Sequence, residues 1–146
     1  KTNKFIGYLP DVPEYYGYMT PLEYLKLCGE ITNMKKEDIK KKSEELLELV
    51  GISDYKKRKI SKFSRGMKQR LGIAQAIMEN PDLILFDEPT NALDDTGVEI
   101  FANIISEYKQ KGKSFILVSH NMDEIKLFCD KVYKIDNYTL KLQDKI

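Results

Sequence analysis

Two stretches of the sequence end in side chains that can hold a cation or move a proton. The apolar run Leu83–Phe86 leads directly into two carboxylates, Asp87 and Glu88. A second apolar run, Phe115–Val118, is followed closely by His120. Removing two adjacent carboxylates from water at the edge of a core is costly unless a cation or hydrogen bonds compensate. One acid on a hard divalent cation and a second acid orienting water would explain the pattern, and a helix cap or a chance surface pair is the alternative.

The elements that must position these side chains follow from the same two runs. Neither run alternates with polar residues, which predicts strands buried on both faces of a parallel sheet. A helix is expected between them over 94–111, with Gly112 as its end. Strands that alternate with helices indicate an α/β fold, and ligands of open α/β sheets bind at the carboxyl ends of the strands. We therefore expect Asp87, Glu88 and His120 to lie at one edge of a mostly parallel sheet.

The remaining elements are a further strand, more helices and a closing hairpin. Thr20, Pro21 and Glu23 form a capping box with proline at the first helical position, which predicts a helix start. The mostly helical first half indicates a helical subdomain beside the sheet. The expected bounds are 5–9 for the strand, 20–31, 36–50 and 64–80 for three helices, about 122–128 for a short helix, and 131–135 and 138–142 for a hairpin that turns at Asp136-Asn137.

Composition excludes several classes of protein. The 146 residues suit one domain, and 24 Lys and Arg against 23 Asp and Glu give a net charge of +1. This balance lacks the basic excess of nucleic-acid binders, so no nucleic-acid partner is expected. The longest apolar run is about five residues, against about 20 for a membrane-spanning helix. Cys28 and Cys129 lack metal-type spacing and are expected to be half-buried structural thiols.

Four segments resemble, in order and spacing, the motifs of ATP-binding-cassette (ABC) transporter ATPases. The segment LILFDEPTNALD at 83–94 resembles the Walker B strand and D-loop, and FSRGMKQRL at 63–71 resembles the signature motif. ILVSH at 116–120 resembles the switch-histidine strand, and IGYLPD at 6–11 stands where the family has its Q-loop. The motifs cover essentially the whole chain. The resemblance implies a partial P-loop NTPase fold of the ABC ATPase type, with ATP and Mg²⁺ as its cofactors.

This resemblance implies roles for individual residues of the predicted edge. Glu88 and His120 would be catalytic, Glu88 by orienting and deprotonating the attacking water and His120 by contacting the γ-phosphate. A half-buried structural histidine is the alternative for His120. Asp87 would hold Mg²⁺ through water. Asp11 replaces the usual Gln of the Q-loop and is a candidate additional metal ligand, of uncertain role.

The signature and the D-loop are implied to act across a dimer. Ser64 begins a helix, whose free backbone N–H groups make an anion site, although ordinary capping is the alternative. The resemblance directs this helix end to the γ-phosphate of ATP bound mainly by a second, head-to-tail subunit. Arg65 either adds a charged phosphate contact or projects into solvent. The signature residues are Ser64, Arg65, Gly66 and Met67, and the D-loop residues are Asn91, Ala92, Leu93 and Asp94, of which the last is also a suitable helix cap.

The implied function is that of an ATP-hydrolysing subunit of an ABC transporter, on the cytoplasmic face of the membrane beside integral membrane permease subunits. An aromatic patch, formed by Tyr15, Tyr16, Tyr18 and Met19, either packs under the helical subdomain or anchors such a permease. Two other functions stay open. One is a soluble ABC-type ATPase that acts on ribosomes or DNA. The other is a non-catalytic partner cassette, against which Glu88 and His120 argue, whereas Asp11 keeps it open.

The family's phosphate-binding loop, G-x-x-x-x-G-K-[ST], does not occur in these residues. Gly112-Lys113-Ser114 imitates its end, but Glu107 stands at the first Gly position, and a helix precedes the motif where a strand is required. We therefore expect the carboxyl-terminal two thirds of one ABC ATPase domain. Residues of about 12–80 would form the Q-loop and helical subdomain, and residues 1–11 and 81–146 half of the catalytic core.

We predict that the isolated 146-residue chain binds ATP weakly and hydrolyses it negligibly. The missing loop supplies most of the N–H groups, and the Lys, that contact the triphosphate in the family. Isothermal titration calorimetry with Mg²⁺ and ATP measures this directly. A micromolar dissociation constant for the isolated chain would contradict the expectation.

Overall fold

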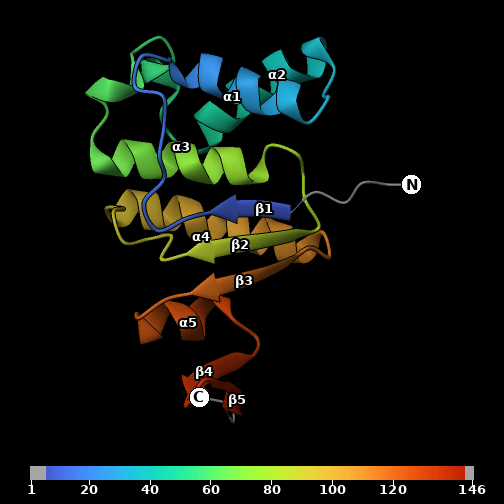
Figure 1. Cartoon of the computed structure of the whole chain (residues 1–146), viewed down its shortest axis with the longest axis vertical. Coiled ribbons are helices and arrows are strands. Elements are labelled where there is room, and N and C mark those ends of the chain that lie inside the picture. The colour runs from blue at the N-terminus through green and yellow to red at the C-terminus, as the bar shows by residue number, and fades with distance from the viewer. Residues whose placement is uncertain (1–5, 144–146) are drawn as a thin grey trace.

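Three parallel strands lie side by side in the computed structural model, which describes residues 6–143 (Figure 1). The central strand β2 pairs with β1 on one side and β3 on the other, so Leu85 lies between Tyr8 and Ile116. Phe5, where the sequence predicts the first strand to begin, lies outside the described residues. The strands are β1 (Ile6–Leu9), β2 (Leu83–Asp87) and β3 (Ser114–Val118).

The helices form where the sequence predicts them. Thr20 and Glu23 make the predicted capping box, because each side chain accepts a hydrogen bond from the other residue's backbone N–H. Gly51, with φ of 77°, follows the second helix. The helices are α1 (Pro21–Ile31), α2 (Lys36–Leu49), α3 (Arg65–Ile77), α4 (Asp95–Gln110) and α5 (Met122–Phe128), with 3₁₀ turns at Ser53–Tyr55 and Ile60–Lys62 between α2 and α3.

The core lies between the sheet and the helices on one of its faces. Phe86 of β2 meets Phe101 of α4 edge-on at 5.1 Å between ring centroids, and Phe101 meets Phe128 of α5 at 5.4 Å. Strand β1 approaches α3 so closely that a Cβ on Gly7 would lie 2.1 Å from the Ala76 carbonyl oxygen. Only glycine fits this contact. In Figure 1, α1 and α2 lie beyond α3 as a helical layer away from the sheet.

The opposite face of the sheet is exposed in the described residues. Ile6, Ile116 and Val118 are 60%, 55% and 52% exposed, and burial alternates along both β2 and β3. The prediction of burial on both faces is therefore wrong for β3, whose outward side chains are exposed, whereas the outward side chains of β2 are half-buried. An apolar run does not show on which faces of a sheet other elements pack. Here α3, α4 and α5 cover only one face.

The chain's last two described strands form an antiparallel hairpin that projects from the body at the bottom of Figure 1. They are β4 (Val132–Asp136) and β5 (Thr139–Gln143). Their two turn residues are Asn137 and Tyr138, one position later than the predicted Asp136-Asn137, because Asp136 pairs with Thr139. A tight hairpin turn of this kind needs positive φ at both central residues, and theirs are 47° and 61°.

The aromatic patch and the thiols occupy mixed environments. Tyr15 is half-buried, with its ring 4.9 Å from that of Tyr24 and its hydroxyl donating to the Lys68 carbonyl oxygen, and burial raises its pKa.

Cys28 and Cys129 are half-buried free thiols, as predicted, and burial raises the pKa of both. Neither is therefore a reactive thiolate. No helix in the part of the chain described here combines the length and apolarity needed to span a membrane.

Candidate functional site at the carboxyl edge of the sheet

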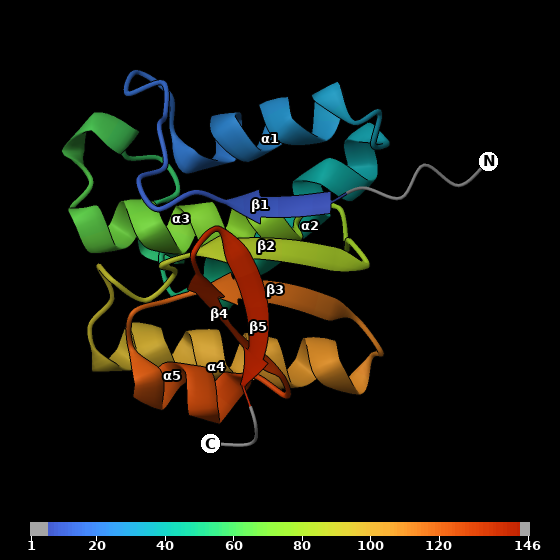
Figure 2. The same ribbon diagram turned by 60° about the horizontal axis from the view of Figure 1, so that its bottom comes forward.

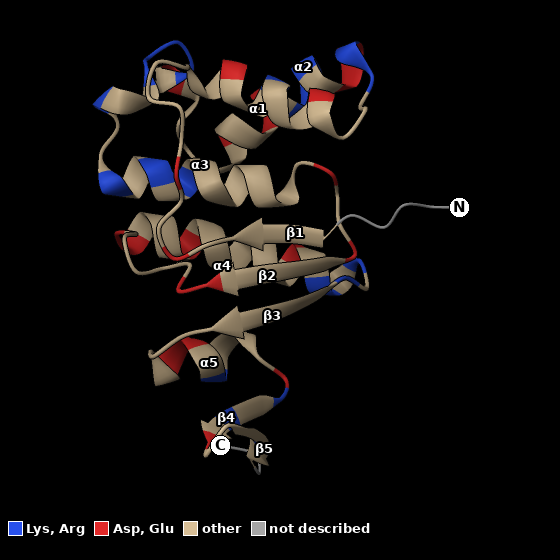
Figure 3. Cartoon of the chain, in the orientation of Figure 1, with Lys and Arg blue, Asp and Glu red and all other residues tan. Residues whose placement is uncertain are grey.

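All three parallel strands end on the same side of the molecule, and α3, α4 and α5 begin there. Figures 1 and 2 show this from two directions. The edge therefore gathers strand carboxyl ends, where the predicted carboxylates and histidine lie, and helix N-termini, whose free N–H groups attract anions. Figure 3 shows the resulting charge pattern, with acidic residues at the end of β2 and basic residues on the first turns of α3.

Glu88 and His120 are in contact at this edge. Glu88 follows β2 directly, and its N–H donates to the Val118 carbonyl oxygen at 2.8 Å. Its side chain is only 13% exposed and meets the Nδ1 atom of His120, whose side chain is 94% exposed. The structure thus brings these two predicted residues into contact. The alternative of a half-buried structural histidine is wrong, because His120 is exposed. A largely buried carboxylate beside an exposed imidazole is suited to proton transfer at the surface of a bound ligand.

The backbone of Glu88 is unusual. Its φ is +48°, in the left-handed region that residues other than glycine seldom adopt. Such conformations cost about 1–3 kcal/mol and persist where the surroundings enforce them, commonly at functional sites. This φ turns the chain away from the sheet immediately after β2.

The carboxylates suit Mg²⁺ bound partly through water and phosphate. Asp87 ends β2 half-buried beside Val118, and Asp11 is exposed two residues after β1. Among the described side chains, no three His, Cys, Asp or Glu gather as a metal-binding cluster. Mg²⁺ typically takes only one or two protein carboxylates and keeps several waters, so this donor set fits it. No hydrogen bond or ion pair joins the described side chains of Asp11 and Asp87. The role of Asp11 as a metal ligand stays a prediction.

The signature residues form the start of α3. The Ser64 side chain caps the helix by accepting a hydrogen bond from the Met67 N–H at 3.2 Å, so the capping interpretation is confirmed. Ser64 and Arg65 are exposed, whereas Gly66 and Met67 are half-buried. The first turn of α3 thus reaches solvent with a hydroxyl and a guanidinium group beside the helix's free N–H groups.

The D-loop residues, Asn91–Asp94, pack against that same first turn. A Cβ on Gly66 would lie 3.0 Å from the Ala92 carbonyl oxygen. Asp94 caps α4 by accepting from the Gly97 N–H at 2.9 Å, and it also accepts from Arg70 at 3.0 Å. These hydrogen bonds, that of Gly97 first, lower the pKa of Asp94. Signature and D-loop are thus held together within one chain.

Four residues of this edge receive no individual role from the sequence patterns. Gln69, Thr90, Ser119 and Glu124 form hydrogen bonds that link the loops after β2 and β3 to α3 and α5. A signal existed for Gln69, which is a polar residue on the otherwise apolar buried face of α3. Glu124 gives no such signal, because an acidic residue in the first turn of a helix is ordinary capping chemistry.

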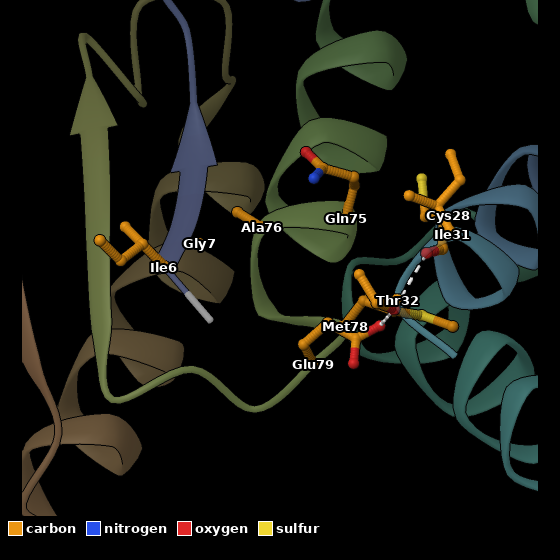
Figure 4. A pocket seen from close by; sticks show the side chains of 9 residues that line it. All are labelled: Ile6, Gly7, Cys28, Ile31, Thr32, Gln75, Ala76, Met78 and Glu79. Carbon is orange, nitrogen blue, oxygen red and sulfur yellow. Dashed lines mark hydrogen bonds between the residues drawn. The ribbon is translucent and has the colours of Figure 1, made fainter. Parts of the chain in front are cut away.

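A pocket of about 230 Å³ lies elsewhere, between the ends of α1 and α3 and the start of β1 (Figure 4). Thr32 donates to Glu79 there, and the half-buried Cys28 lines the wall. This pocket is at the amino ends of the strands. It therefore takes no part in the chemistry of the carboxyl edge.

Comparison with known proteins identifies the family. Residues 1–91 match the family described as ABC transporter, and this chain belongs to it. The chain is 39% identical over 120 residues to the ABC transporter ATP-binding protein NatA of Bacillus subtilis, covering 82% of this chain and 49% of that protein. It is 37% identical over 132 residues to an uncharacterized ABC transporter ATP-binding protein of Methanocaldococcus jannaschii, covering 90% and 50%. The chain thus spans about half the length of these relatives.

Solved structures share the fold. An ATP-binding subunit of an ABC transporter superposes with a TM-score of 0.86 at 26% identity, over 93% of this chain and 57% of that one. A dimeric ATP-binding cassette in a post-hydrolysis state, bound to ADP and Pi, gives a TM-score of 0.86 at 24% identity, over 97% and 63%. The predicted α/β fold of the ABC ATPase type, with its parallel sheet, is confirmed.

We predict that the cap of α4 weakens in acid. The folded-state pKa of Asp94 lies below its ordinary value of 3.8, so the carboxylate's contribution is complete above that pH and is lost as the pH falls through the folded-state pKa. The difference in free energy of unfolding between the wild type and Asp94→Asn should therefore be largest above pH 3.8 and shrink as the pH falls below that value. Urea denaturation at each pH measures it.

Asp95→Asn is the control for that series, because it removes the adjacent carboxylate and keeps both hydrogen bonds of Asp94. A wild-type to Asp94→Asn difference that stays constant over the whole range would contradict the assignment of the cap.

Proposed function

We propose that this chain is part of an ATP-hydrolysing subunit of an ABC transporter, with ATP and Mg²⁺ at the carboxyl edge of its sheet. The observation that carries the proposal is the contact of Glu88 with His120 at the ends of β2 and β3, in a member of the ABC transporter family. The names of the relatives support the transporter assignment. In this proposal residues 12–80 contain the helical subdomain, and residues 1–11 and 81–146 half of the catalytic core.

Each residue of the edge then has a task. Glu88 is the general base that orients the attacking water and takes its proton, and its low exposure keeps the carboxylate from being fully solvated. His120 contacts the γ-phosphate and steadies the Glu88 carboxylate. Asp87 would hold Mg²⁺ through water, and Asp11 would be an additional ligand. The bound ion would stabilise negative charge on the phosphoryl oxygens.

A second ABC ATPase subunit completes the site in this proposal. Ser64 and Arg65 are exposed at the start of α3, and Ser64 Oγ and the helix's N–H groups suit an anion. They would contact the γ-phosphate of ATP held mainly by the partner, in a head-to-tail dimer whose contact includes Asn91–Asp94. Gly66 allows the D-loop to pack against the same turn.

Permease subunits on the cytoplasmic face of the membrane are the proposed further partners. Tyr16 and Tyr18 are 56% and 68% exposed with rings 5.9 Å apart, while Tyr15 packs inward. Exposed aromatic pairs are typical anchors of protein interfaces. A soluble ATPase acting on ribosomes or DNA is not favoured by the relatives, and a non-catalytic cassette is not favoured by the Glu88–His120 contact.

We predict that, in a longer protein that also supplies the phosphate-binding loop, Glu88→Gln lowers the rate of ATP hydrolysis at least about 100-fold and leaves ATP affinity nearly unchanged. An amide keeps the size of the side chain and cannot take the proton. Phosphate release measures hydrolysis, and binding of a fluorescent ATP analogue measures affinity. The exposed Glu99→Gln on α4 is the matched control. Full activity of Glu88→Gln would rule out the proposed base.

A further inference from the structure

The turn directly after Glu88 is held from two sides by side chains of different helices. Gln69 of α3 is only 3% exposed, and its Nε2 donates to the Pro89 carbonyl oxygen at 2.8 Å. Thr90, only 8% exposed, donates its hydroxyl hydrogen bond to Glu124 Oε1 of α5. These are long-range contacts, separated by 20 and 34 positions in the sequence. Buried polar groups need hydrogen-bond partners, so loss of either bond would leave a buried polar group unsatisfied.

Glu124 also reaches the loop that carries the histidine. Its second carboxylate oxygen accepts from the Ser119 hydroxyl at 3.4 Å, and Ser119 Oγ accepts from the Asn121 N–H at 3.0 Å. Ser119 directly precedes His120. One carboxylate of α5 therefore bridges the turn after β2 and the turn after β3.

The backbone of the turn is strained and has few anchors of its own. Glu88 is strained by its φ of +48°, and Pro89 has no N–H with which to anchor the chain. The bond from the Glu88 N–H to Val118 fixes the start of the turn. The Asn91 N–H also donates to the Glu88 carbonyl oxygen at 3.3 Å, but that bond lies within the turn itself. Without the bonds to α3 and α5, the strained residue could relax and carry its carboxylate away from His120.

We propose that Gln69 and Glu124 are positioning residues, which clamp Pro89 and Thr90 and so hold the Glu88 carboxylate against His120. This inference deepens the proposed function and rests on it for its catalytic meaning. Neither side chain touches the reacting groups. Gln69 acts through the Pro89 carbonyl, from the helix that begins with the signature, and Glu124 acts through Thr90 and Ser119.

The contact itself can be followed without any activity, because His120 is the only histidine among the 146 residues. Its imidazole Cε1–Hε1 signal in NMR spectra of this chain reports the nearby carboxylate at a fixed pH. Glu88→Gln should move the signal. In a Gln69→Leu background the same substitution should move it by less than half as much, because the clamp is already released.

Three further variants separate the clamp from an effect on folding. Gln75→Leu makes the same exchange on α3, at a residue that lines the distant pocket, and should keep the full effect of Glu88→Gln. Glu124→Leu should reduce that effect, whereas Glu124→Gln should restore it, because the amide oxygen still accepts from Thr90. A full effect of Glu88→Gln in both the Gln69→Leu and the Glu124→Leu backgrounds would overturn the proposal. If Gln69→Leu does not fold, the Glu124 pair decides alone.

Kinetics of the longer protein give the second readout. Gln69→Leu and Glu124→Leu should lower kcat at least about tenfold through misplacement of the base, with KM for ATP within about twofold of wild type. Glu124→Gln should recover most of kcat. Unchanged kcat in both leucine variants would contradict a positioning role. A wild-type protein without ATPase activity would instead refute the proposed function, and the NMR result would still decide whether the clamp exists.

Discussion

The hydrogen bond from the Glu88 N–H to the Val118 carbonyl oxygen is the constraint on which the site depends. It extends the parallel pairing of β2 and β3 one residue past the end of β2, so the two strands deliver their terminal side chains at the same height. The chain must then leave the sheet at once, and the left-handed φ of Glu88 makes that turn. The carboxylate lies against His120 as a consequence, although the two residues are 32 positions apart. The pairing of β2 with β3 therefore brings Glu88 and His120 into contact.

The surrounding helices supply both electrostatics and rigidity. Three of them begin at the same edge, so their N-termini favour a polyphosphate close to carboxylates that would otherwise repel it. In the proposed site, a cation between phosphate and carboxylates would offset the repulsion between these two kinds of negative group. Arg70 fixes the helices relative to one another, because it donates both to the Val50 carbonyl oxygen at the end of α2 and to Asp94. The helical layer, the signature helix and the D-loop are thus connected through one guanidinium group.

Local sequence chemistry predicts the helices and the site's main residues well. Capping residues such as Thr20, Ser64 and Asp94 mark the helix starts to within a residue, because a cap and its partners lie within three positions. Apolar runs correctly predict the strands and the edge where Glu88 and His120 meet. They do not predict that one sheet face is exposed, since that depends on which other elements pack there. The partners of Gln69 and Glu124 escape prediction for the same reason, because they lie 20 and 34 positions away in the sequence, although Gln69 stands out as a polar residue on a buried face.

We propose that a magnesium–nucleotide complex binds at the edge of the sheet formed by Asp87, Glu88 and His120. A crystal structure of the longer protein with Mg²⁺ and a nonhydrolysable ATP analogue tests it most directly. We predict the terminal phosphate beside His120, with the ion between that phosphate and Asp87 and an ordered water at Glu88. An analogue bound elsewhere on the protein, with this edge empty, would contradict the account.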